Sequence, residues 1–186
     1  DASEAAHEVS EARVDTAAPE ESELVALARR TIDTYVRERR VIAPPKPDGV
    51  LAERHGAFVS LHREGDLRGC IGTIGPTQES LAEEIVHNAI QAATADPRFP
   101  ALTPGELADL EISVDVLHEA EPATMADLDP RTYGVIVSAD WRRGLLLPDL
   151  EGVDTAEQQV GIALRKAGIG MNERFTLERF RVDRYR

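Results

Sequence analysis

Cysteine is nearly absent from this 186-residue chain, which contains a single one, and this excludes a disulfide bond within the chain. One thiol fits a reducing compartment, so we expect a cytoplasmic protein. Long apolar runs are also missing, since no stretch of about 18 apolar residues is available to cross a membrane. A secretory signal has a basic region followed by an apolar one, whereas the first residues of this sequence are acidic. No secretory signal is visible, and we expect no membrane association.

Positive charge is scarce as well. The chain has 21 lysines and arginines against 34 aspartates and glutamates, and its formal net charge is −13. Residues 1–23 hold eight acids and one arginine, a net charge of −7. An acidic surface repels phosphate backbones, so we expect no nucleic-acid partner. Residues 1–21 carry few large apolar side chains, which predicts a mobile acidic tail in front of a domain at residues 22–186.

Cofactor signatures are missing too. No Cys–His pair has the spacing of metal ligands, and the scattered histidines do not form a zinc signature. Gly168–Gly170 follows a predicted helix rather than a strand, so it is not a dinucleotide fingerprint. We therefore expect neither a metal nor a cofactor.

The segment Leu67–Thr73 is the most informative feature that is present. It places the only cysteine, Cys70, between Gly69 and Gly72 and two residues after Arg68. Glycines let the backbone adopt unusual conformations or let another group approach closely. If the segment is extended, Arg68 and Cys70 share a face about 7 Å apart, and Arg68 is then a candidate for ionising the thiol.

The size of this charge effect depends on the surroundings of the thiol. A free thiol with a pKa of about 8.5 needs about 2 kcal/mol of preferential stabilisation to be half ionised at pH 7. A guanidinium at about 7 Å supplies about 2.4 kcal/mol at an effective dielectric constant of about 20, but about 0.6 kcal/mol in water. Arg68 therefore activates Cys70 only inside a cleft. A buried cysteine that fills space is the alternative.

Hydrophobic periodicity and turn residues predict helices and strands that arrive mixed, without regular βαβ alternation. This favours an α+β domain with a mainly antiparallel sheet flanked by helices. The second helix is expected to begin with Thr77 as its cap, and its N-terminal N–H groups would stabilise a thiolate if the chain folds back onto Cys70. The expected helices are 22–40, 77–95 and 155–167, and the expected strands are 56–62, 66–71, 111–117, 133–139, 144–147 and 175–185.

The segment Asp96–Pro100 is the second candidate site. Prolines at both 97 and 100 stiffen it, so Asp96 and Arg98 are presented in fixed directions, and a guanidinium can hold a carboxylate or a phosphate with two bonds. The alternative is that Asp96 and Arg98 only pair with each other. The polar strand face of Ser113 and Asp115 is a candidate lining of the same site, with a solvated outer face as the alternative.

Three histidines lie near predicted strand ends, where each is a candidate base for Cys70. These are His55, His62 and His118, and the sequence does not choose among them.

Five segments together resemble the AMMECR domain family, the A component of the AmmeMemoRadiSam set, over about residues 22 to 186. Many relatives carry a histidine where this chain has Tyr133, so a role for that imidazole cannot be transferred. The resemblance implies an α+β domain with a cleft near the cysteine, but it supplies no reaction. The segments, in family order, are Leu67–Thr73, Asp96–Pro100, Tyr133–Val137, Arg143–Pro148 and Leu164–Gly168.

Two functions remain open from the sequence. In the first, the protein has a cysteine-centred cleft that acts on or binds a small anionic substrate, with Cys70 and Arg68 as catalytic residues. Its substrate-binding residues would then be Gly69, Gly72, Thr73, Asp96 and Arg98. In the second, it is a non-catalytic binding or scaffold module whose cleft holds a peptide, a metabolite or a partner protein, and in the family setting that partner is a Memo-like or radical-SAM protein.

Overall fold

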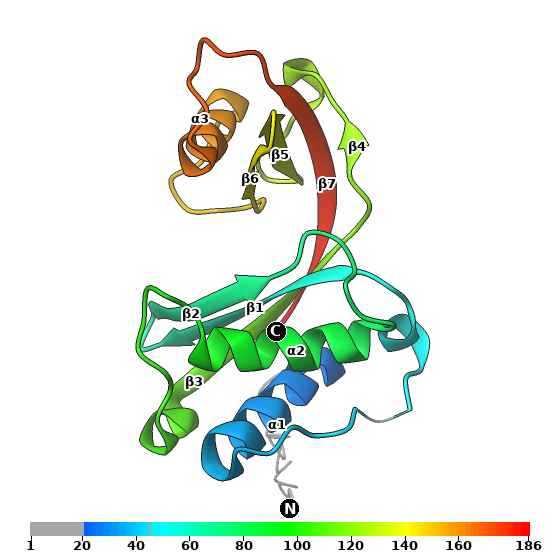
Figure 1. Cartoon of the computed structure of the whole chain (residues 1–186), viewed down its shortest axis with the longest axis vertical. Helices are drawn as coiled ribbons and strands as arrows, with labels where there is room; N and C mark the ends of the chain where they lie inside the picture. The colour runs from blue at the N-terminus through cyan, green and yellow to red at the C-terminus, as the bar shows by residue number, and fades with distance from the viewer. Residues whose placement is uncertain (1–20, 45) are drawn as a thin grey trace, which may run out of the picture.

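The computed structural model describes residues 21–44 and 46–186. The predicted acidic tail, apart from Glu21, therefore lies outside the described residues. The described chain contains three α-helices and seven strands in a mixed order (Figure 1). They are α1 (Glu23–Glu38), β1 (Gly56–Arg63), β2 (Asp66–Gly72), α2 (Leu81–Thr94), β3 (Leu110–Leu117), β4 (Glu121–Pro122), β5 (Tyr133–Ala139), β6 (Arg142–Leu146), α3 (Ala156–Ala167) and β7 (Thr176–Tyr185).

All strands belong to one sheet with the order β2-β1-β3-β7-β5-β6, and β4 pairs with β7. Every pairing is antiparallel. Strand β7 is long and pairs with β3 near its end and with β5 near its start, so it connects two lobes (Figure 1). The first lobe contains α1, α2 and β1–β3, and the second contains α3, β5 and β6. The predicted α+β class with a mainly antiparallel sheet is confirmed.

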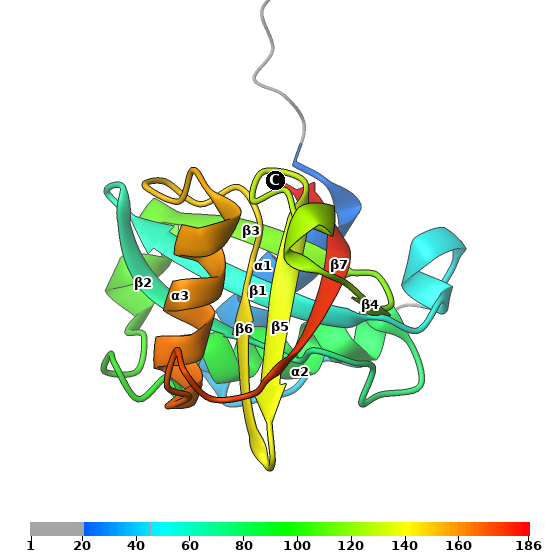
Figure 2. The ribbon, with the colours of Figure 1, turned by 90° about the horizontal axis from the view of Figure 1, so that it is seen from above.

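Helices α1 and α2 cover one face of the first lobe's sheet (Figures 1 and 2). Along β1, Ala57, Val59 and Leu61 are completely buried in the main hydrophobic cluster together with residues of both helices. Because successive side chains of a strand point to opposite faces, Phe58, Ser60 and His62 face away from the helices. The second face of this sheet is thus left for the site described below.

The second lobe has its own core, in which α3 packs on β5 and β6. A smaller cluster lies at the junction of the lobes and includes the buried Phe180 of β7, Leu145 of β6 and the partly buried Phe58 and Leu147. Phe58 and Leu147 therefore extend this junction cluster to the surface of the protein.

Local sequence signals account for most helix ends. Ser22 caps α1 and Thr155 caps α3, and α3 ends at Gly168 with a left-handed φ of 70°. The expected cap at Thr77 is wrong, because α2 begins after Ser80, whose side chain accepts from the Glu83 N–H. The buried carboxylate of Glu84 instead holds the preceding loop by accepting from the Thr77 and Gln78 backbone.

Within the described ranges, the structure contains no helix whose length and hydropathy would suit a membrane span.

Candidate functional site

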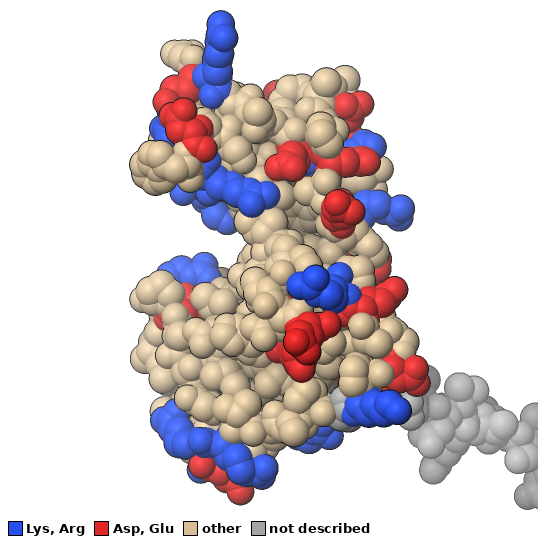
Figure 3. Space-filling view, turned by 45° about the vertical axis from the view of Figure 1, so that its right-hand side comes forward, with Lys and Arg blue, Asp and Glu red and all other residues tan. Residues whose placement is uncertain are grey.

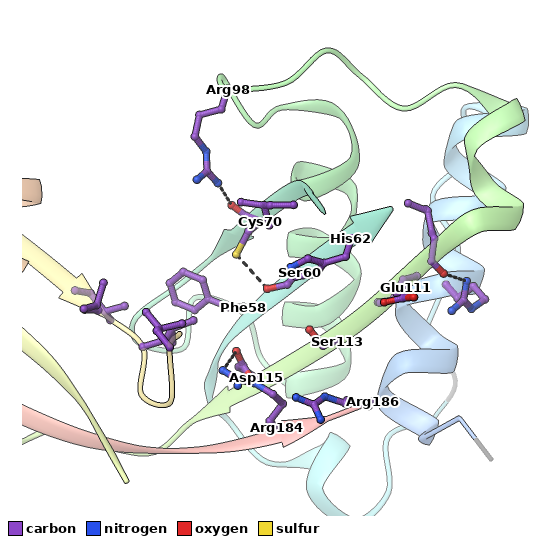
Figure 4. Close-up of a pocket in the computed structure, with 18 of the residues that line it drawn as sticks. Phe58, Ser60, His62, Cys70, Arg98, Glu111, Ser113, Asp115, Arg184 and Arg186 are labelled. Atoms are coloured by element: carbon purple, nitrogen blue, oxygen red, sulfur yellow. Dashed lines mark hydrogen bonds and ion pairs between the residues drawn. The ribbon is translucent and has the colours of Figure 1, made fainter. Parts of the chain in front are cut away.

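The open face of the first lobe's sheet is the floor of a cleft of about 1170 Å³. From neighbouring strands, the floor presents Cys70 on β2, Ser60 and His62 on β1, and Ser113 and Asp115 on β3 (Figure 4). The strand register places Ser60 between Cys70 on one side and Ser113 on the other. A row of hydroxyl and thiol groups therefore crosses the floor.

The second lobe supplies the opposite wall of the cleft. It contributes Leu145, Leu146 and Leu147 from β6 and its end, Leu150 from the following loop, and Lys166 from α3. Figure 3 shows the molecule hollowed on one side between the lobes, with lysine or arginine side chains above and below the hollow. The site is therefore assembled from segments that lie about 100 residues apart in the sequence.

Cys70 is a half-buried residue that lines the cleft, and its Sγ lies 3.2 Å from the Ser60 Oγ (Figure 4). Burial raises the pKa of the Cys70 thiol, and the bond with Ser60 and the positive charge of Arg98 offset this only in part. The thiol is therefore mainly neutral near pH 7. The direction of this shift argues against the expectation of a thiol held partly ionised by nearby positive charge.

The carboxylate of Asp96 fastens the outer edge of β2 at the cysteine. It is buried and accepts from the Cys70 N–H at 3.0 Å, from the Arg98 N–H at 3.1 Å and from the Arg98 guanidinium at 2.8 Å. Hydrogen bonds from the Arg98 side chain hold the pKa of Asp96 well below its usual range, and the two backbone donors contribute in the same direction. The Cys70 N–H is thus occupied and is not available to stabilise a developing negative charge on a ligand.

Arg98 is the predicted cation that does reach the cysteine region. Its side chain is 56% exposed, and it both pairs with Asp96 and donates to the Cys70 carbonyl at 3.4 Å. The pairing with Asp96 was one of the two readings of this loop. Arg98 can also hold the carboxylate or phosphate of a ligand, as the other interpretation has it. It lines the cleft, and its Nη1 makes no hydrogen bond within the described residues.

Arg68 does not face Cys70, contrary to the expectation from a regular strand. The register of β1 and β2 shifts between Leu61 and His62, so that Leu67 rather than Arg68 shares the cleft face with Cys70. The Arg68 side chain is largely buried outside the cleft, where its guanidinium donates to Glu106 at 2.7 Å and to the Pro100 carbonyl at 2.8 Å. A one-residue bulge therefore removes Arg68 from the cleft.

The remaining residues of the cysteine segment have structural contacts. A Cβ at Gly69 would lie 2.4 Å from the Ala92 carbonyl oxygen of α2, and one at Gly72 would lie 2.3 Å from the Phe58 ring. The Thr73 hydroxyl accepts from the Asn88 amide at 3.2 Å. The C-terminal end of α2, rather than its N-terminus, therefore lies beside this segment, which corrects the proposed thiolate-stabilising helix end.

His62 lines the cleft, and the other two candidate histidines do not. His118 pairs with Asp183 at 2.7 Å, and the rings of His118 and His55 are 5.5 Å apart in an edge-on arrangement. Within the described part of the chain, no group of His, Cys, Asp and Glu side chains has the arrangement of a metal site.

Sequence reasoning missed Lys166, the cation that the second lobe places opposite Cys70. Its Nζ donates to the Leu145 carbonyl at 2.8 Å, which leaves two of its three protons for other acceptors. Lys166 is exposed as a residue, but partial desolvation of its ammonium group lowers its pKa and the nearby positive charge of Arg98 lowers it further, whereas an ionised Cys70 would raise it. The one sequence signal for Lys166 was its position in the family-like segment Leu164–Gly168. Its closeness to Cys70 depends on the tertiary arrangement of the two lobes, which local sequence patterns do not give.

Arg184 of β7 was also missed, although Asp115 was a candidate. The two form a pair with an Nε–Oδ1 distance of 2.7 Å, in which the Asp115 side chain is 3% exposed. The polar face of β3 is therefore part of the cleft floor, and its carboxylate is neutralised there.

A two-lobed α+β fold with one antiparallel sheet and a cysteine in the cleft between its lobes defines the class of this protein. The chain belongs to the AMMECR1 family, whose model matches residues 25–186. It is 52% identical over 167 residues to a Thermotoga maritima protein, covering 87% of this chain and 96% of that protein.

Two further relatives have different extents. A Clostridium acetobutylicum protein is 48% identical over 171 residues, which cover 90% of this chain but 36% of that longer protein. The crystal structure of an uncharacterized protein from Pyrococcus horikoshii is similar, with a TM-score of 0.80, 32% identity and coverage of 87% of this chain and 88% of that one. The likeness confirms the fold and carries no activity with it.

Proposed function

We propose that this protein binds a small anionic molecule in the cleft between its lobes, with the anionic group between Lys166 and Arg98 and the neutral Cys70 thiol against it. The observation that carries the proposal is the presence of Lys166, which forms no ion pair with another described residue, opposite the only thiol. Some other charges of the cleft are balanced in pairs, such as Asp115 with Arg184, whereas Glu111 and Arg186 at its far side form no ion pair among the described residues. An acidic protein that keeps an unpaired cation in its cleft favours an anion there.

Binding is supported better than nucleophilic catalysis by a preformed thiolate. The raised pKa of Cys70 keeps the proton on sulfur, and Asp96 occupies the backbone N–H that would otherwise face a developing oxyanion. Cys70 and Ser60 together offer a polar edge that can donate to and accept from a bound molecule. We therefore assign Cys70 to ligand contact.

The proposal is tested with the thiol itself, because Cys70 is the only cysteine and all alkylation reports on it. Iodoacetate is an anion and iodoacetamide is its neutral analogue, and both form an S–C bond with release of iodide. We expect the rate ratio of iodoacetate to iodoacetamide to exceed that of 2-mercaptoethanol by about three- to tenfold, because a cationic cleft concentrates anions. Lys166→Gln is expected to remove most of this excess.

Arg165→Gln is the matched control, since Arg165 is the neighbouring exposed cation of α3 and does not line the cleft. It should leave the ratio unchanged. A wild-type ratio equal to that of 2-mercaptoethanol, or equal losses in both variants, would contradict the proposed anion site.

A further inference from the structure

We infer that the ligand of this cleft is an amphipathic anion, a carboxylate or phosphate ester with an acyl or aryl body, rather than a fully polar anion such as inorganic phosphate. This inference rests on the proposed function and specifies its ligand class. It follows from where the apolar side chains of the cleft lie relative to Lys166.

The wall beside Lys166 is apolar. The Lys166 ammonium group bonds to the Leu145 carbonyl, so the cation is fixed at the strand that carries Leu145 and Leu146. Leu147 and Leu150 continue this wall and remain partly exposed. A group bound to Lys166 therefore has leucine side chains on the same side.

The opposite side of the cleft continues the apolar surface. Phe58, which covers Gly72, is only partly buried, and Leu67 is 37% exposed next to Cys70 on the cleft face. Phe58 and Leu147 pack against the junction cluster and are themselves only partly buried, so apolar surface next to this cluster is exposed on the cleft side. An acyl or aryl group would complete this cluster, and a fully polar ligand would leave it exposed to water.

The dimensions agree with a body of several carbon atoms. The floor crosses β2, β1, β3 and β7, which spans about 14 Å at the usual spacing of strands. The volume of about 1170 Å³ lies slightly above the usual range of about 300 to 1,000 Å³ for small-molecule sites, so it leaves room for such a body. The charged group would occupy the Lys166–Arg98 end, and the body would extend along the leucine wall toward the paired Asp115 and Arg184.

Straight-chain carboxylates test this inference as protectors of Cys70 from iodoacetamide. Butanoate, hexanoate and octanoate carry the same charge and differ only in chain length. We expect the concentration that halves the alkylation rate to fall about fourfold per added methylene, the factor that corresponds to about 0.8 kcal/mol per buried methylene. Hexanamide, which is neutral, should protect at least about fivefold more weakly than hexanoate.

Two variants test the apolar lining of the cleft while leaving Lys166 unchanged. Leu67→Ala and Leu147→Ala are each expected to weaken protection by octanoate more than protection by butanoate. Leu67 is 37% exposed and belongs to none of the hydrophobic clusters of the described residues, so its truncation should leave the fold intact. Equal protection at all chain lengths, or no protection by octanoate, would overturn the amphipathic ligand while leaving the iodoacetate result to stand. Loss of the iodoacetate preference itself would instead remove the proposed function.

Discussion

Gly69→Ala is expected to lower the free energy of unfolding by about 3 kcal/mol. The added Cβ would lie 2.4 Å from the Ala92 carbonyl oxygen, and this oxygen belongs to the backbone of α2, so no flexible side chain can yield. Either α2 or β2 must shift, which costs packing in the main hydrophobic cluster. Urea denaturation followed by circular dichroism measures the loss.

Gly75→Ala is the matched control for this substitution. No atom lies within 4 Å of a Cβ built at Gly75, and its φ is not in the left-handed region. Gly75→Ala should change the free energy of unfolding by no more than about 0.5 kcal/mol. Any stabilisation would come from the lower conformational entropy of the unfolded chain. A loss at Gly69 no larger than that at Gly75 would show that α2 does not approach β2 so closely.

Asp96→Ala is expected to cost about 2 to 3 kcal/mol at pH 7. It removes the acceptor of the Cys70 N–H and leaves that donor without a partner in a partly buried strand edge. The cost stays below that of a fully buried ion pair, because the Arg98 side chain is 56% exposed and can turn to water. Asp33→Ala, which breaks only the exposed pair with Arg37, is the control and should change stability by less than about 0.5 kcal/mol.

The difference between Asp96→Ala and the native protein should shrink as the pH falls. Because the pKa of Asp96 is lowered in the folded state, its stabilising contribution is complete above the unfolded-state pKa near 4 and is lost as the pH falls toward the folded value. Urea denaturation at pH 7, 5 and 3 measures this directly. A difference that is constant or grows on acidification would contradict the assigned carboxylate contacts.

The order and type of elements could be predicted from the sequence because each element depends on nearby residues. The cap at Ser22, the alternation along Glu111–Leu117 and the stop at Gly168 are local signals, and the structure places element ends within a few residues of them. The helix start predicted at Thr77 was wrong because Thr77 donates its backbone N–H to the Glu84 carboxylate and does not cap α2. Glu84 lies inside that helix, so this contact could not be predicted before the helix start was known.

The site was less predictable, because it depends on a bulge and on the placement of two lobes. The bulge at Arg68 changes which residue shares a face with Cys70, and alternation alone gives the wrong partner. Lys166 reaches the cleft only because β7 joins the lobes in one sheet. The closeness of Asp96 and Arg98 to Cys70 was not predicted either, because the intervening helix was expected to place its N-terminus, rather than its C-terminal end, beside the cysteine.

The pH dependence of Cys70 alkylation by iodoacetamide in the native protein tests the central claim most directly, namely that a neutral thiol lies open to small molecules in the cleft. The account predicts complete labelling without denaturant, with a midpoint above the value of about 8.5 for a free thiol, because burial raises the pKa of Cys70. A midpoint below that value would show an ionised nucleophile, and labelling only after unfolding would show a sealed thiol. Either result would contradict the account.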